Sequence, residues 1–142
     1  MTLPLRDSLI LESLHFSLEE SRQYRQLLHP FEWVFLTHGD EGYHHHRLLG
    51  YPMQMQGDQQ LQCQLQTHLL KHQLPDAWHR LEESVQAPIK AQAREWLLLV
   101  QIDTDEYAQV TWGEVGSLSY WIKREDLTVR NFAQCWAIDD SL

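Results

Sequence analysis

Residues 96–121 read WLLLVQIDTDEYAQVTWGEVGSLSYW and hold three of the six tryptophans in a chain of 142 residues. The stretch opens with the nearly unbroken apolar run 96–102, which is typical of a short strand buried on both faces of a sheet. An acid-rich turn at 103–106 ends the run, because aspartate side chains bond readily to the backbone of turns. We expect the rest of the chain to pack against a sheet built here.

Two alternating segments follow this turn. Ala108, Val110 and Trp112 alternate with polar residues, which predicts a strand at about 108–112 with these three side chains inward. After a link with glycine at each end, residues 117–122 alternate again and place Trp121 on the opposite face from Tyr120. The sequence therefore predicts a three-stranded antiparallel meander with strands at about 96–102, 108–112 and 117–122.

Helices are expected before the meander. Ser17 and Glu20 have the spacing of a capping box, and the helix that they begin should end before Pro30. A second helix is predicted from Gln59 to about residue 71, with Asp58 as its cap. A third should begin near residue 75 and end near residue 88.

The C-terminal part completes the predicted fold. Residues 123–129 favour one or two helical turns, and the apolar segment 132–138 favours a last strand. We predict an α+β fold, an antiparallel sheet with two or three helices packed on one side, in a single domain over 1–142.

Composition narrows the classes of function. The net charge of −9 argues against a nucleic-acid binder and against an anionic membrane surface, but permits a basic protein partner. No apolar stretch approaches the ~18 residues of a membrane helix, and no secretory signal is visible, so a cytoplasmic location is expected. Cys63 and Cys135 could form one disulfide, and their sequence positions leave the pairing open.

Three segments carry a family resemblance. The first is 46–52, reading HRLLGYP, with Gln56, Gly57 and Asp58 after it. The second is the strand and acidic turn 97–105, and the third is 112–122, which begins WGEVG. In order and spacing they resemble the YwqG family, bacterial proteins described by a domain of unknown function, over roughly residues 9–138.

Two features depart from that family's pattern. Glu114 stands where aspartate is usual, and an earlier Gly-Gly-x-Pro segment of the family is not found. The chain therefore resembles the C-terminal half of the family's domain, either as a shortened member or as a half that a partner or a second copy completes. The family has no settled activity, and some of its members resemble immunity-type proteins.

Histidines offer the first candidate for chemistry. His44 and His46 point the same way in an extended segment, and His38 could join them, so the loop 38–46 is a candidate metal site. The alternative is a solvated loop. His68 and His72 lie one turn apart on a predicted helix, but Lys71 between them disfavours a cation.

Carboxylates and tryptophans offer the second candidate. Asp103 and Asp105 lie in one turn, and Glu114 lies about 15 Å away at the other end of the predicted strand 108–112, so we do not expect a shared ion. Trp112 either fills the core or contacts a ligand, and Trp121, on the other face, is the better surface residue. The predicted interaction or ligand surface comprises His46, Gly50, Tyr51, Gln56, Asp103, Asp105, Trp112, Gly113, Glu114 and Trp121.

The functional prediction is a non-enzymatic protein-interaction module that uses an acidic, aromatic surface to engage a protein partner or a second copy. No nucleophile arrangement or phosphate loop is visible, and no cofactor is expected. One alternative is a metal- or small-ligand-binding protein using the loop 38–46, and another is a structural half that only completes a homo-oligomer.

Overall fold

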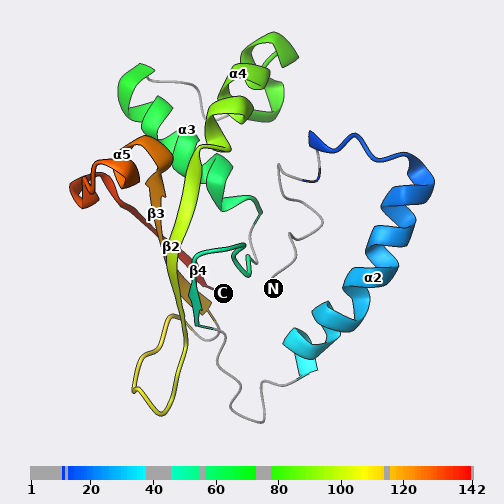
Figure 1. Cartoon of the computed structure of the whole chain (residues 1–142), viewed down its shortest axis with the longest axis vertical. Helices are drawn as coiled ribbons and strands as arrows, with labels where there is room; N and C mark the ends of the chain where they lie inside the picture. Colours follow the sequence, from blue (N-terminus) through cyan, green and yellow to red (C-terminus); the bar gives the residue numbers. More distant parts are fainter. Residues whose placement is uncertain are drawn as a thin grey trace.

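A four-stranded antiparallel sheet lies at the centre of the computed structural model, with strands in the order β1-β2-β3-β4 (Figure 1). The structure describes residues 11, 13–37, 46–54, 57–72, 78–113 and 116–141. The strands are β1 (Arg47–Leu48), β2 (Trp96–Asp103), β3 (Gly116–Lys123) and β4 (Trp136–Ser141).

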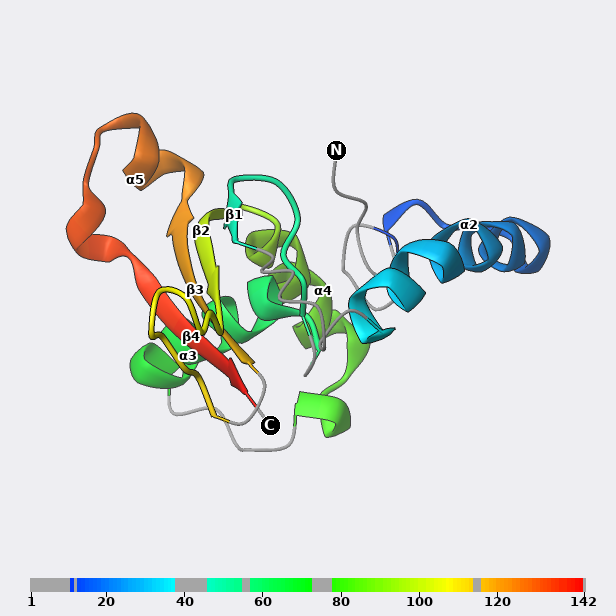
Figure 2. The ribbon, with the colours of Figure 1, turned by 90° about the horizontal axis from the view of Figure 1, so that it is seen from below.

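Helices α3 and α4 lie on the same side of this sheet, whereas α2 stands apart from it in both views (Figures 1 and 2). This arrangement confirms the predicted α+β class. The helices are α2 (Leu18–Thr37), α3 (Gln59–His72), α4 (Glu83–Ala93) and α5 (Arg124–Thr128), with short 3₁₀ turns at Trp78–Arg80 and Phe132–Gln134.

The predicted strand at 108–112 is wrong. β2 pairs directly with β3, and residues 104–113 form a loop between them, where only Asp105 and Val110 form an isolated bridge. The carboxylate of Asp105 accepts the N–H of Ala108 at 3.0 Å, and the hydroxyl of Thr104 accepts the N–H of Trp112 at 3.1 Å. Such side-chain bonds to the backbone compete with a sheet ladder, and here they hold the loop instead.

The core lies on the face of the sheet that carries Trp121, opposite to the face expected. Trp96, Leu98 and Trp121 are each no more than 2% exposed, and they form one cluster with Cys63 of α3. Trp121 is therefore a core residue, and its assignment to the surface is wrong. Small serines alternate with it along β3, which leaves room on this face for side chains from α3.

Glutamine side chains of α3 satisfy the buried indoles. The Nε1–H of Trp96 donates to Oε1 of Gln64 at 3.0 Å, and that of Trp121 donates to Oε1 of Gln59 at 3.1 Å. The amide of Gln59 in turn donates to the buried carboxylate of Asp140 at 2.9 Å. Buried polar groups need such partners, so this network fixes how α3 seats on the sheet.

Both predicted helix caps are confirmed. The N–H of Ser17 donates to Glu20 at 2.8 Å, and the N–H of Glu20 donates back to the hydroxyl of Ser17 at 3.3 Å. The hydroxyl of Ser17 also donates to the Glu20 carboxylate at 2.7 Å, and this bond together with the one from the Ser17 N–H lowers the pKa of Glu20. The carboxylate of Asp58 accepts the N–H of Leu61 at 2.8 Å, which caps α3.

The predicted helix ends at the prolines are wrong, because α2 continues through Pro30 to Thr37 and α4 continues through Pro88 to Ala93. A proline inside a helix costs roughly 3 kcal/mol through one lost hydrogen bond and a crowded carbonyl. In α4, the turn after Pro88 buries Ile89 and Ala93 almost completely, and this burial offsets the cost.

The last strand begins later than predicted. Residues 132–134 form a 3₁₀ turn, and β4 pairs with β3 from Trp136 to Ser141. The segment 139–141 lies beyond the predicted strand but belongs to β4, because it pairs with residues 116–118 of β3. The carboxylate of Asp140 also accepts the side-chain amide of Gln59 from α3.

Candidate functional site

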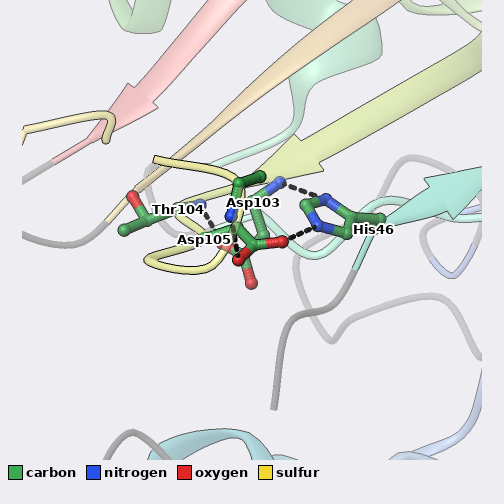
Figure 3. Close-up of polar contacts among 5 residues, drawn as sticks. His46, Asp103, Thr104 and Asp105 are labelled. Carbon is green, nitrogen blue, oxygen red and sulfur yellow. Dashed lines mark hydrogen bonds and ion pairs between the residues drawn. The ribbon is translucent and has the colours of Figure 1, made fainter. Parts of the chain in front are cut away.

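His46 lies immediately before β1 and forms hydrogen bonds to residues at and just after the end of β2 (Figure 3). Nδ1 of His46 accepts the backbone N–H of Asp103 at 3.1 Å, and Nε2 lies 3.0 Å from a carboxylate oxygen of Asp105. Because Nδ1 accepts a backbone donor, the neutral ring carries its proton on Nε2 and donates it to Asp105. The side chain of His46 is 43% exposed and that of Asp105 is 13% exposed.

Both ring nitrogens of His46 are thus engaged in hydrogen bonds. A metal ion or a substrate proton would have to displace one of them. In this arrangement His46 fastens the loop 104–113 to the edge of the sheet.

Arg47 follows His46 and is half-buried. Burial lowers its pKa, and the charge of Asp103 opposes that shift. Its guanidinium donates to the carbonyl oxygen of Tyr51 at 3.4 Å, which helps to hold the chain turn after β1. Leu49 and Gly50 in that turn have positive φ angles of 62° and 82°.

A cavity of about 500 Å³ lies beside this turn. Its walls come from residues 49–52, the start of α3, the start of β2 and α5. Trp96 and Trp121 contribute buried aromatic surface, and Leu97 and Leu127 contribute half-buried aliphatic surface. The volume falls within the roughly 300–1,000 Å³ that is typical of small-molecule sites.

Two arginines also line the cavity. Arg94 precedes β2, and Arg124 follows β3. The backbone N–H of Arg124 donates to the carbonyl oxygen of Glu95 at 2.9 Å, so the two arginines lie at the same end of the central strands β2 and β3. The guanidinium of Arg124 is 3.5 Å from the carboxylate of Glu95, and both side chains are more than half exposed.

The face of the sheet opposite α3 carries an apolar row across all four strands. The register pairs Leu48 with Val100, Val100 with Tyr120, and Tyr120 with Ala137. Directly paired residues share a face, and these four residues form what we call the outer row. Leu48 is 80% exposed and Tyr120 is 36% exposed, and Asp139 lies on the same face two residues after Ala137.

A family model described as a domain of unknown function, DUF1963, matches residues 7–140. The chain belongs to the DUF1963 family. No curated protein and no solved structure matches it. The resemblance to YwqG and the view that the chain corresponds to half of a domain stay predictions.

The predicted site residues of this DUF1963 domain divide into separate groups. His46, Asp103 and Asp105 come together through hydrogen bonds, whereas Gly50, Tyr51 and Trp121 line the cavity. The remaining predicted residues that the structure describes are Trp112 and Gly113, in the loop after Asp105; Gln56, Glu114, His38 and His44 lie outside the described residues.

Trp112 of the DUF1963 domain is half-buried in the loop rather than aligned on a strand. Among the described residues its buried indole Nε1 has no hydrogen-bond partner. Gly113 beside it is exposed and has a φ of 59°, which glycine adopts at little cost.

Sequence reasoning missed Arg94 and Arg124. Each stands within two residues of a predicted strand, one before the first strand and one after the last strand of the meander. An antiparallel pairing of 96–102 with 117–122 would have placed them at the same edge. The false strand at 108–112 hid that pairing.

The two cysteines are free. Cys63 is fully buried in the core, and Cys135 is half-buried near the end of the chain. Burial raises the pKa of both thiols, and nearby carboxylates, Asp58 for Cys63 and Asp126 for Cys135, act in the same direction. A thiol held protonated is a weak nucleophile.

Within the described ranges of this DUF1963 domain, no three side chains of His, Cys, Asp or Glu gather into a metal-holding group. His38 and His44 are outside those ranges, so the metal hypothesis stays a prediction. No helix in the described part of the chain has the length and apolar character needed to cross a membrane.

Proposed function

We propose that this DUF1963 domain is a non-enzymatic protein-interaction module that binds a basic protein partner through the outer face of its sheet. The observation that carries the proposal is the outer row, which aligns Leu48, Val100, Tyr120 and Ala137 in register across four strands. Apolar and aromatic side chains of this kind supply most of the binding free energy at protein interfaces.

Charge selects the class of partner. The chain carries 20 acidic against 11 basic residues, and Asp139 is exposed beside the outer row. Glu106 and Tyr107 are exposed in the loop 104–113. Acidic groups around an apolar centre steer a basic partner to the face and repel a second acidic copy.

A non-enzymatic role is supported by the side chains that could otherwise do chemistry. His46 has both ring nitrogens in hydrogen bonds, and Cys63 is buried with a raised pKa. Neither side chain is poised as a base or a nucleophile. A cytoplasmic location and an immunity-type role are part of the same proposal; the location rests on the sequence analysis, and the immunity-type role rests on the family resemblance alone.

Site-specific photo-cross-linking in cells tests the proposal. A benzophenone amino acid at position 120 should give an adduct with one basic protein, and the same group at exposed Ser84 of α4 should not. Asp139→Lys should lower the yield at position 120 by reversing the local charge. No adduct at position 120 would contradict the proposal, and an adduct between two copies would favour the homo-oligomer alternative.

A further inference from the structure

We propose that the cavity beside Arg94 and Arg124 binds a small organic acid with an apolar body and one anionic group. This site is distinct from the outer row and does not depend on the proposed interaction function. Its ligand would be held by apolar contacts inside the cavity and by the two guanidinium groups at its edge.

The walls determine the body of the ligand. Trp96 and Trp121 are no more than 2% exposed and donate their indole N–H groups to Gln64 and Gln59, so they back the cavity and offer a ligand no donors. Leu49 and Leu97 supply apolar surface that a ligand can contact. Leu127 of α5 adds aliphatic surface. A small apolar group matches this lining and this volume.

The arginines determine the charged group. Among the described residues no hydrogen bond or ion pair engages the guanidinium of Arg94, and Arg124 has only a 3.5 Å contact with exposed Glu95. Exposed ion pairs of this kind are weak, so an incoming anion can exchange with Glu95. Arginine presents parallel N–H donors that suit carboxylate, phosphate or sulfonate oxygens.

The acidic wall residue fixes the orientation. Asp58 lines the cavity, and its carboxylate already accepts the N–H of Leu61 to cap α3. A second anion beside Asp58 would be repelled, so the anionic group of the ligand belongs at the arginine edge.

A pair of fluorescent probes tests the inference. The first, 8-anilinonaphthalene-1-sulfonate, has an aromatic body and a sulfonate, and the second, N-phenyl-1-naphthylamine, has the same body without the charge. We expect saturable binding of the sulfonate at one site, with energy transfer from tryptophan. Combined Arg94→Gln and Arg124→Gln substitution should weaken the sulfonate about tenfold and change the neutral probe less than about twofold.

Two controls locate the binding. Arg80→Gln removes an exposed arginine that does not line the cavity, and Tyr120→Glu alters the outer row. Both variants should bind the sulfonate as the unaltered protein does. Thermal unfolding and near-ultraviolet circular dichroism of each variant establish that its fold is retained.

Several results would overturn the inference. They are unsaturable binding, equal loss of both probes in the double variant, undiminished sulfonate binding in that variant, and loss of binding in Tyr120→Glu. If the double variant does not fold, the salt dependence of probe binding to the unaltered protein tests the inference instead. Its affinity for the sulfonate should fall as salt rises from 10 mM to 0.5 M, and its affinity for the neutral probe should not.

Discussion

His46 accepts a backbone N–H at Nδ1 and donates at Nε2, and this pair of bonds predicts an unprotonated Nδ1 in the neutral ring. Long-range proton–nitrogen NMR should show that tautomer. His46→Ala should cost about 1 kcal/mol of unfolding free energy, because both hydrogen bonds are partly exposed to water. Urea denaturation measures this, with exposed His79→Ala as a control that should change little.

Gln59 supports two buried groups, the indole of Trp121 and the carboxylate of Asp140. Gln59→Ala leaves both without this partner, so we expect a loss of about 2–4 kcal/mol in unfolding free energy. Gln66→Ala on the exposed side of the same helix should stay within about 0.5 kcal/mol. Similar losses in both variants would show that the buried network does not set the effect, because alanine is a better helix former than glutamine.

Cys63 links stability to pH. Its pKa in the folded protein is raised above the ordinary value of 9.0 because burial disfavours the thiolate. Because the thiol has a higher pKa in the folded protein than in the unfolded chain, its contribution to the free energy of unfolding is complete below the unfolded pKa. That contribution is lost as the pH rises from the unfolded pKa through the folded pKa. Stability should therefore fall above about pH 9, and Cys63→Ala should flatten that fall.

A thiol reagent should modify Cys135 before Cys63, and the reverse order would contradict the burial argument.

At the scale of elements, the absence of a side chain at Gly116 lets the start of β3 pack closely against the end of β4. An added β-carbon would lie 2.6 Å from Cβ of Ser141 and 2.6 Å from the carbonyl oxygen of Trp112. Gly116→Ala must shift this backbone, so we expect a loss of about 2–4 kcal/mol. Gly57→Ala meets no atom within 4 Å and should cost only about 1 kcal/mol, through its φ of +95°. Thermal unfolding compares the two variants, and an equal cost would show that the clash at Gly116 is relieved.

The strands with the longest regular patterns were predictable from sequence. Residues 96–102 and 117–122 were placed within one residue of β2 and β3. The strand at 108–112 failed because Asp105 and Thr104 bond to the backbone of the loop, and a five-residue alternation carries no information about such bonds. The prediction of which face of β3 is buried was wrong. The face with Trp121 is buried because glutamine side chains of α3 satisfy the indole N–H groups there, and hydrophobicity alone does not reveal such partners.

The candidate sites were predictable only in part. The segment 46–52 and the turn at 103–105 were both selected from sequence, but nothing in the pattern indicates that His46 reaches across to Asp103 and Asp105. Such contacts depend on the pairing of β1 with β2, and a two-residue strand leaves no periodic signal. The cavity depends in the same way on the β2–β3 register, which brings Arg94 and Arg124 to one edge.

At the scale of the whole molecule, charge and apolar surface are distributed unevenly. An acidic chain of net charge −9 places an exposed carboxylate beside its outer row and two arginines beside its cavity. The two surfaces therefore suit ligands of opposite charge. Substitutions at one surface should leave binding at the other unchanged, because Trp121 of the cavity wall and Tyr120 of the outer row lie on opposite faces of the sheet.

The same charge predicts the state of association. Two copies that meet through their outer rows would bring their Asp139 side chains and their net negative charges together, and this repulsion acts over about 30 Å at 0.01 M salt but about 8 Å at 0.15 M. Light scattering should therefore give the mass of one chain at low salt, with any self-association growing as salt rises and vanishing in Tyr120→Glu. A stable dimer at low salt would mean that a second copy completes the sheet face despite the repulsion. The homo-oligomer alternative would then replace the basic partner as the occupant of the outer row.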